Sequence, residues 1–217
     1  MSGYDPIILD LDGTVIDTVE LIRVSFRHAV STVLGNDLPD EVIMAGVGKP
    51  LMTQMRALSA EHAQELYDAY REYNHRVHDD LIRGYDGMEA ALGRLKAADR
   101  RLAIATSKSA DVTAMGFRSL PDLRAYFDVV VTASDSSAHK PSPEPLLLAL
   151  ERLGAAAEKA IYIGDAPVDI EAGRAAGMAT AAVLWGMFSR ESLVAARPDF
   201  VLTTPAEMVD LCLDGAA

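Results

Sequence analysis

Two carboxylates close to the N-terminus have the spacing of a catalytic pair. The apolar run 7–9 is followed at once by Asp10, and Asp12 comes two residues later, just before Gly13. A short apolar run of this kind predicts a buried strand, whose period of two would place both carboxylates on one side of its end. Two like charges so close need a cation or a shared proton. The alternative is a strand followed by an ordinary Asp-Gly turn, and the pair alone does not decide between them.

Polar side chains also follow three later apolar runs, and together with the first pair they provide the groups that hold a phosphoryl group. They comprise four carboxylates, one ammonium and one hydroxyl. Hard cations such as Mg2+ prefer oxygen ligands and are often held by one or two carboxylates and a substrate phosphate. Phosphoryl transfer depends mainly on positioning and charge neutralisation. The residues are Asp10, Asp12, Thr106, Lys140, Asp165 and Asp169.

Each of these side chains suits one task in a phosphoryl-transfer site. Asp10 and Asp165 are the best candidates to bind Mg2+, and Asp169 is suited to orienting the ligands or the waters around it. Lys140 and Thr106 are suited to the non-bridging oxygens of the phosphate. The set therefore predicts a metal site beside a phosphate site.

The first two carboxylates would then divide the chemistry between them. A carboxylate can attack phosphorus and form an acyl phosphate that water later cleaves, which makes Asp10 the expected nucleophile. Asp12 would protonate the leaving oxygen and afterwards activate water.

The fold that would position these residues is indicated by the order of the elements. From residue 88 onward, helical stretches alternate with short apolar runs, which favours an α/β fold with a doubly wound parallel sheet and helices on both faces. Ligands in such sheets bind beyond the carboxyl ends of the strands, where the polar residues would gather. After the first run, the strand-like runs are 102–105, 129–131, 161–163, 179–184 and 200–202.

Between Thr14 and Gly84 the pattern is helical and contains no strand-like run. Apolar residues recur at three- and four-residue intervals from Val15 onward, and a second apolar stripe runs through 61–82. We therefore expect an all-helical cap domain over 17–83, inserted into an α/β core made of 1–16 and 84–217. The two adjacent linkers would let the cap hinge.

Composition limits the classes of function. A chain of 217 residues with 50% hydrophobic content can bury one sizeable core with a smaller lobe. Its net charge of −12 disfavours nucleic acid and anionic membrane surfaces as partners. The N-terminus lacks the features of a signal peptide, and no apolar run is long enough to cross a bilayer. The single cysteine cannot form an internal disulfide. The cytoplasm is therefore the expected location.

Four strings in this order resemble the motifs of the haloacid dehalogenase superfamily of phosphatases. They are 10–15, Thr106-Ser107, Lys140-Pro141 and 164–169, and the resemblance covers the whole chain. The helical insertion is similar to the first class of caps in that superfamily. The strings 176–178 and 184–186 resemble its phosphoglycolate phosphatase and pyrophosphatase branch.

The resemblance implies the same roles for the carboxylates, with an aspartyl-phosphate intermediate and Mg2+ as cofactor. It adds Ser107 to the phosphate ligands and the backbone carbonyl of Asp12 to the metal ligands, and it places Asp165 and Asp169 in the acidic metal motif. Two positions depart from the common pattern. Ser107 stands where many members have Asn, and Ala166 where many have Ser or Thr, and neither change removes a principal charge.

Two cations of the expected cap are candidates for substrate contact. Lys49 lies on the turn 46–50, whose glycine spacing does not fit a phosphate-binding loop, and it could meet the non-reacting part of the substrate. Arg23 lies on the first cap helix and could bind a second anionic group. The alternative for both is a solvated side chain.

The function predicted first is a Mg2+-dependent phosphatase that hydrolyses a small phosphorylated metabolite, a phosphomonoester of the phosphoglycolate kind. The alternatives are an inorganic pyrophosphatase or a phosphosugar mutase of the β-phosphoglucomutase kind. A non-catalytic binding protein is less favoured because no catalytic carboxylate is missing. The cap is expected to select the substrate.

Overall fold

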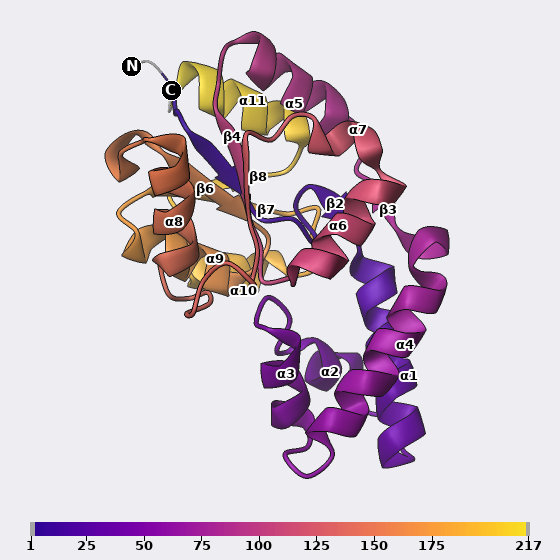
Figure 1. Cartoon of the computed structure of the whole chain (residues 1–217). Coiled ribbons are helices and arrows are strands. Elements are labelled where there is room, and N and C mark those ends of the chain that lie inside the picture. Colours follow the sequence, from indigo (N-terminus) through magenta and orange to yellow (C-terminus); the bar gives the residue numbers. More distant parts are fainter. Residues whose placement is uncertain (1–2, 216–217) are drawn as a thin grey trace.

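The computed structural model describes residues 3–215, and its centre is one parallel sheet of six strands in the order β5-β4-β1-β6-β7-β8 (Figure 1). The strand order changes direction at β1, so the sheet is doubly wound, as predicted. The strands are β1 (Ile7–Leu9), β4 (Leu102–Ala105), β5 (Val129–Val131), β6 (Ile161–Gly164), β7 (Ala179–Val183) and β8 (Phe200–Leu202).

The apolar run at the N-terminus forms the central strand. Ile7 pairs with Leu102 of β4 on one side and with Ile161 of β6 on the other. All three residues of β1 are fully buried because helices cover both faces of the sheet. The carboxyl ends of β1, β4 and β6 therefore lie side by side, at the edge where the polar residues follow.

Side chains alternate between the two faces and build two apolar layers. Ile7 and Leu9 pack with α5, α7 and α11, whereas Ile8 packs with α8 and α9. This alternation places helices on both faces, as the sequence pattern predicted. The helices of the core are α5 (Met88–Ala97), α6 (Ala110–Ser119), α7 (Pro121–Arg124), α8 (Glu144–Leu153), η1 (Ala157–Lys159), α9 (Pro167–Ala175), α10 (Arg190–Ala195) and α11 (Pro205–Asp214).

The chain between β1 and α5 forms a separate group of helices beyond the carboxyl edge of the sheet (Figure 1). Helices α1 and α4 pack along each other, with the rings of Phe26 and Tyr70 4.8 Å apart between centroids. These helices have an apolar cluster of their own, which explains why the insertion needs no strand of the main sheet. They are α1 (Val19–Leu34), α2 (Asp40–Met44), α3 (Leu51–Leu58) and α4 (Ala63–Leu81).

The helical insertion expected from the sequence is joined to the core by a short two-stranded element. Two short strands, β2 (Ile16–Asp17) and β3 (Arg83–Gly84), pair antiparallel where the chain leaves and re-enters the core, and α1 begins only at Val19. Strands of two residues leave no periodic signal in a sequence. The pair lies where the sequence predicts the domain boundaries, which themselves stay a prediction. Among residues 3–215, no helix has both the length and the apolar character that crossing a bilayer requires.

Candidate active site

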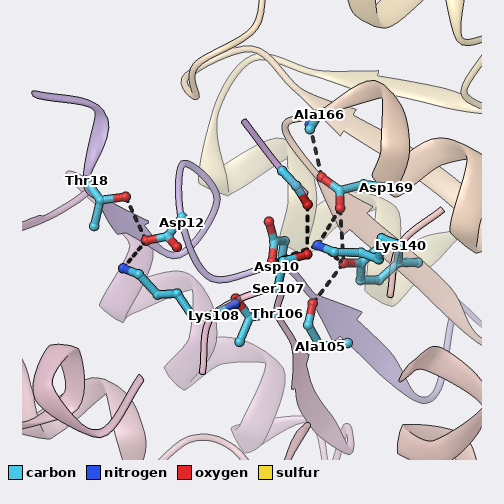
Figure 2. A network of polar contacts seen from close by, with 12 residues as sticks. Asp10, Asp12, Thr18, Ala105, Thr106, Ser107, Lys108, Lys140, Ala166 and Asp169 are labelled. Carbon is cyan, nitrogen blue, oxygen red and sulfur yellow. Dashed lines mark hydrogen bonds and ion pairs between the residues drawn. The ribbon is translucent and has the colours of Figure 1, made fainter. Parts of the chain in front are cut away.

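The six predicted polar residues converge at the carboxyl edge of the central strands. Asp10, Thr106 and Asp165 directly follow β1, β4 and β6, and Asp169 lies in the first turn of α9. Lys140 comes from the loop between β5 and α8, and its side chain reaches back to the end of β1 (Figure 2). The strand order brings together residues that are up to 159 positions apart in the chain.

Lys140 is the buried cation of this edge. Its Nζ lies 2.9 Å from Oδ1 of Asp10 and 2.7 Å from Oδ1 of Asp169, and the three side chains are 1%, 7% and 0% exposed. The same nitrogen donates a hydrogen bond of 3.0 Å to Oη of Tyr162, which itself donates to the carbonyl of Ala105 on β4. Lys140 is therefore held in one position by groups from three elements.

Three buried carboxylates lie together here, and Lys140 pairs with two of them. Asp10, Asp165 and Asp169 each present an oxygen within 4.8 Å of the others. When all three carboxyl groups are ionised, one ammonium faces three carboxylates and the cluster carries an excess of two negative charges. Burial raises the pKa of Asp10 to about 7 despite the nearby Lys140 ammonium, and burial followed by the charges of Asp169 and Asp10 raises the pKa of Asp165 well above its ordinary value.

Backbone packing fixes the orientation of two of these carboxylates. Oδ2 of Asp165 accepts a hydrogen bond of 2.7 Å from the Met187 amide, and the side chain lies between Gly13 and Gly186, where a Cβ atom on either glycine would collide with it. Asp169 accepts a hydrogen bond of 3.0 Å from the Ala166 amide through Oδ2. The carboxylates are thus held in place before any ligand arrives.

The donor set fits a divalent cation. It offers only carboxylate oxygens, which are the ligands that hard cations prefer, and its excess of two negative charges equals the charge of one such ion. Asp169 already shares its oxygens with Lys140 and the Ala166 amide, which favours an orienting role for it. The metal site predicted from the sequence therefore has suitable residues, and the identity of the ion is part of the proposal below.

Asp12 lies apart from this cluster, although only one residue separates it from Asp10. Its Oδ1 accepts a hydrogen bond of 2.7 Å from Oγ1 of Thr18 and one of 2.5 Å from Nζ of Lys108, as Figure 2 shows. Sequence reasoning gave Lys108 no role. The available signal was its place two residues after Thr106, at the end of the same strand.

The two hydroxyl residues after β4 have different surroundings. Thr106 is buried, its amide donates to the carbonyl of Val131 at the end of β5, and its Oγ1 accepts a hydrogen bond of 3.2 Å from the Lys108 amide. Ser107 donates a hydrogen bond of 2.7 Å through Oγ to the carbonyl of Gly48, on the turn before α3. Ser107 therefore joins the core to the cap in this conformation.

A cavity of about 260 Å3 lies between the sheet edge and the cap helices. Asp10, Asp12, Ser107 and Asp165 line it from the core. Lys49 lines it from the cap, and its contact with substrate stays a prediction. Its apolar lining residues include Ile22, Phe26, Val47, Leu51, Met52, Val112, Met187 and Phe188.

Arg23 does not line this cavity. Its guanidinium pairs with Glu20 at 3.0 Å and with Asp40 at 3.6 Å on the surface of the cap. The spacing of three residues between Glu20 and Arg23 on one helix was a visible signal for this pairing. The substrate contact expected for Arg23 has no support in this arrangement.

Comparison with known proteins places the whole chain among proteins of related sequence and fold. A family model described as haloacid dehalogenase-like hydrolase matches residues 7–183. A pyrophosphatase PpaX from Bacillus velezensis is 38% identical over 205 residues, which cover 94% of each chain, and one from Bacillus cereus is 37% identical over 96% of each chain.

Solved structures agree with these sequence relatives. A haloacid dehalogenase-like family hydrolase from Streptococcus pneumoniae superposes with a TM-score of 0.80 at 26% identity, covering 95% of this chain and 97% of that chain. A hydrolase from Pseudomonas syringae superposes with a TM-score of 0.84 at 25% identity, covering 95% of this chain and 96% of that chain. Both the sheet and the helical insertion fall within these matches.

Proposed function

Because this chain belongs to the haloacid dehalogenase-like hydrolase family, we propose that it is a Mg2+-dependent phosphatase whose substrate is inorganic pyrophosphate. The observation that carries the choice of substrate is the similarity to PpaX pyrophosphatases at 37–38% identity over nearly the full length of both chains. The sequence alone favoured a phosphomonoester of the phosphoglycolate kind and kept pyrophosphate as an alternative. The relatives support the alternative better.

In the proposed reaction, Asp10 is the nucleophile. A carboxylate oxygen of Asp10 attacks one phosphorus of pyrophosphate, the bond from that phosphorus to the bridging oxygen breaks, and an aspartyl-phosphate forms. Lys140, 2.9 Å from Asp10, offsets negative charge next to the attacked phosphorus. Thr106 is fixed at the same edge, where its hydroxyl can donate to a non-bridging oxygen.

Asp12 moves the proton in both half-reactions. It donates a proton to the bridging oxygen as the first phosphate leaves, and it then takes a proton from the water that attacks the aspartyl-phosphate. Asp12 lines the same cavity as Asp10 and is partly exposed to it, which suits a group that must exchange protons with water. The products are two phosphate ions and the regenerated carboxylate of Asp10.

The residues proposed to hold Mg2+ are Asp10, Asp165 and the backbone carbonyl of Asp12, with Asp169 orienting them. When bound, the ion would polarise the phosphoryl oxygens and offset their charge. The charge balance of the buried cluster supports this assignment, because with the three carboxyl groups ionised Lys140 leaves two negative charges without a counter-charge.

A second candidate substrate is an organic phosphomonoester. The apolar residues that line the cavity from the cap and from Met187 and Phe188 favour it, because pyrophosphate has no apolar surface to bury against them. A phosphosugar mutase would also need to keep water away from the aspartyl-phosphate, and no particular contact in the cavity favours that reaction.

The test is a comparison of kcat/KM for pyrophosphate, phosphoglycolate and a hexose phosphate in the presence of Mg2+. We expect pyrophosphate to give the highest value, and excess EDTA to stop phosphate release. Asp10→Asn should abolish turnover while the circular dichroism spectrum stays that of the folded wild type. A higher kcat/KM for an organic ester would reject pyrophosphate as the preferred substrate, and full activity of Asp10→Asn would reject the mechanism.

A further inference from the structure

Lys108 is the cation that contacts the proposed proton donor. Its Nζ lies 2.5 Å from Oδ1 of Asp12, and its side chain is 17% exposed and lines the cavity. The backbone of Lys108 is fixed on both sides: its amide donates to Oγ1 of Thr106 at 3.2 Å, and its carbonyl accepts from the Ala133 amide at 2.8 Å. These contacts fix the backbone from which the Lys108 side chain extends to Asp12.

We propose that Lys108 binds the leaving phosphate of pyrophosphate and thereby selects substrates whose leaving group is an anion. This inference rests on the proposed function. The bridging oxygen must come within about 2.6–3.2 Å of Asp12 to receive its proton. Because the Lys108 ammonium touches that same carboxylate, it lies within reach of the non-bridging oxygens on the leaving phosphorus. There it stabilises the charge that develops as the bridging bond breaks.

The other cations near the cavity are less suited to this role. Lys140 is buried beside Asp10 and Asp169, next to the phosphoryl group that is transferred. Arg71 also lines the cavity, but its guanidinium is already engaged by Asp111 on α6 at 2.6 Å and by the hydroxyl of Tyr67 at 3.1 Å. Lys49 is exposed on the cap turn, on the wall opposite the core. Lys108 is thus the cavity cation placed where the leaving group departs.

The contacts of Asp12 allow Lys108 to change partner. Oδ1 of Asp12 also accepts a hydrogen bond of 2.7 Å from Thr18, whose side chain is buried. When the Lys108 ammonium turns to a phosphate oxygen, Asp12 keeps this second donor and stays in place. The carboxylate is then free of one ion pair at the step in which it handles the proton.

The proposal predicts a loss that depends on the charge of the leaving group. Lys108→Met should lower kcat/KM for pyrophosphate by about 100-fold, the size typical of one lost donor to a developing negative charge. The same variant should lower kcat/KM for ethyl phosphate by less than about 3-fold, because its leaving group departs as a neutral alcohol. Lys108→Arg, which keeps the charge, should recover part of the pyrophosphate activity.

The matched control is Lys96→Met. Lys96 also pairs with an aspartate, Asp128, at 2.8 Å, but this pair lies on the surface of the core, away from the cavity. Lys96→Met should leave kcat/KM for both substrates unchanged. The unfolding midpoints of all variants show whether each variant is folded. An equal loss of Lys108→Met on both substrates, or no loss on pyrophosphate, would overturn the role of Lys108.

Failure of the proposed function gives a different result from failure of this inference. If the wild type does not hydrolyse pyrophosphate, the proposed function fails before any variant is compared, and the role of Lys108 fails with it. If the wild type does hydrolyse pyrophosphate, only the ratio between the two substrates in Lys108→Met decides the inference.

Discussion

Replacing Lys140 by methionine tests whether this residue balances the buried charge of the site. Lys140→Met keeps most of the side-chain volume and removes the ammonium that pairs with two of the three buried carboxylates. Breaking a buried ion pair by deleting one partner costs about 3–5 kcal/mol, because the remaining charge has no counter-charge in a medium that solvates it poorly. We expect the metal-free variant to lose this amount of unfolding free energy.

The free-energy cost of proton uptake gives an independent value for the loss of unfolding free energy in Lys140→Met. The cluster can relieve the uncompensated charge by keeping one more carboxyl protonated in the folded state. At pH 7, this costs about 1.4 kcal/mol for each of the roughly three pH units above the ordinary pKa of an aspartate, or about 4 kcal/mol. At pH 5 the cost falls to about 1.5 kcal/mol, so the destabilisation should shrink as the pH is lowered.

The assay is urea unfolding followed by circular dichroism, with EDTA, at pH 7 and pH 5. Lys96→Met is the control, since its pair with Asp128 is 33% and 40% exposed and should contribute no more than about 1 kcal/mol. The double variant Lys140→Met, Asp169→Asn should recover part of the loss by removing one of the stranded carboxylates. A loss in Lys140→Met no larger than that in Lys96→Met, or one that does not change with pH, would refute the reasoning.

Three further predictions concern other parts of the molecule. In metal-free protein, the contribution of Asp10 to the unfolding free energy should be greatest below about pH 4 and should be lost as the pH rises to about 7. The reason is that burial raises the folded-state pKa of Asp10 to about 7, so the unfolded chain releases this proton at a lower pH than the folded chain does. Urea midpoints measured against pH test this expectation. Gly48→Ala should lower kcat/KM, because a Cβ atom at residue 48 would lie 2.9 Å from Val168. The control is Gly35→Ala, because Gly35 also has a positive φ but has open space around it. Equal effects of the two substitutions on kcat/KM would contradict this prediction. Cys212 should resist iodoacetamide at pH 8 in folded protein and react in urea, because burial raises its pKa to about 12; rapid labelling of the folded chain would argue against its burial.

The parts of the fold that the sequence predicts are those with a local signal. The run 7–9 is apolar and ends at a carboxylate, so both the strand and the polar edge beyond it could be read from neighbouring residues. Parallel topology followed from the alternation of elements, and it implied that Asp10, Thr106 and Asp165 would meet, because carboxyl ends of parallel strands share an edge. The structure brings these three residues to that edge.

The parts that were not predicted depend on partners that are distant in the chain. Ile16 pairs with Gly84, and no periodicity reports a two-residue contact of that kind. The role inferred for Lys108 requires that the end of β4 lie beside Asp12, which only the strand order creates. For Arg23, the sequence could predict the helix face on which it lies. It could not predict toward which part of the molecule the cap turns that face.

The central position of β1 also has a consequence for how the chain folds. Its two neighbours, β4 and β6, lie about 95 and 155 residues later, so the first strand to be synthesised cannot complete its hydrogen bonding until most of the chain has emerged. The helices α1 and α4, by contrast, meet through contacts within a span of about 65 residues. Non-local pairing delays folding, because the entropy cost of closing a long loop arises before the stabilising contacts can form. We expect the cap to gain hydrogen-exchange protection before β1 during refolding, and β1 amides protected first would contradict this order.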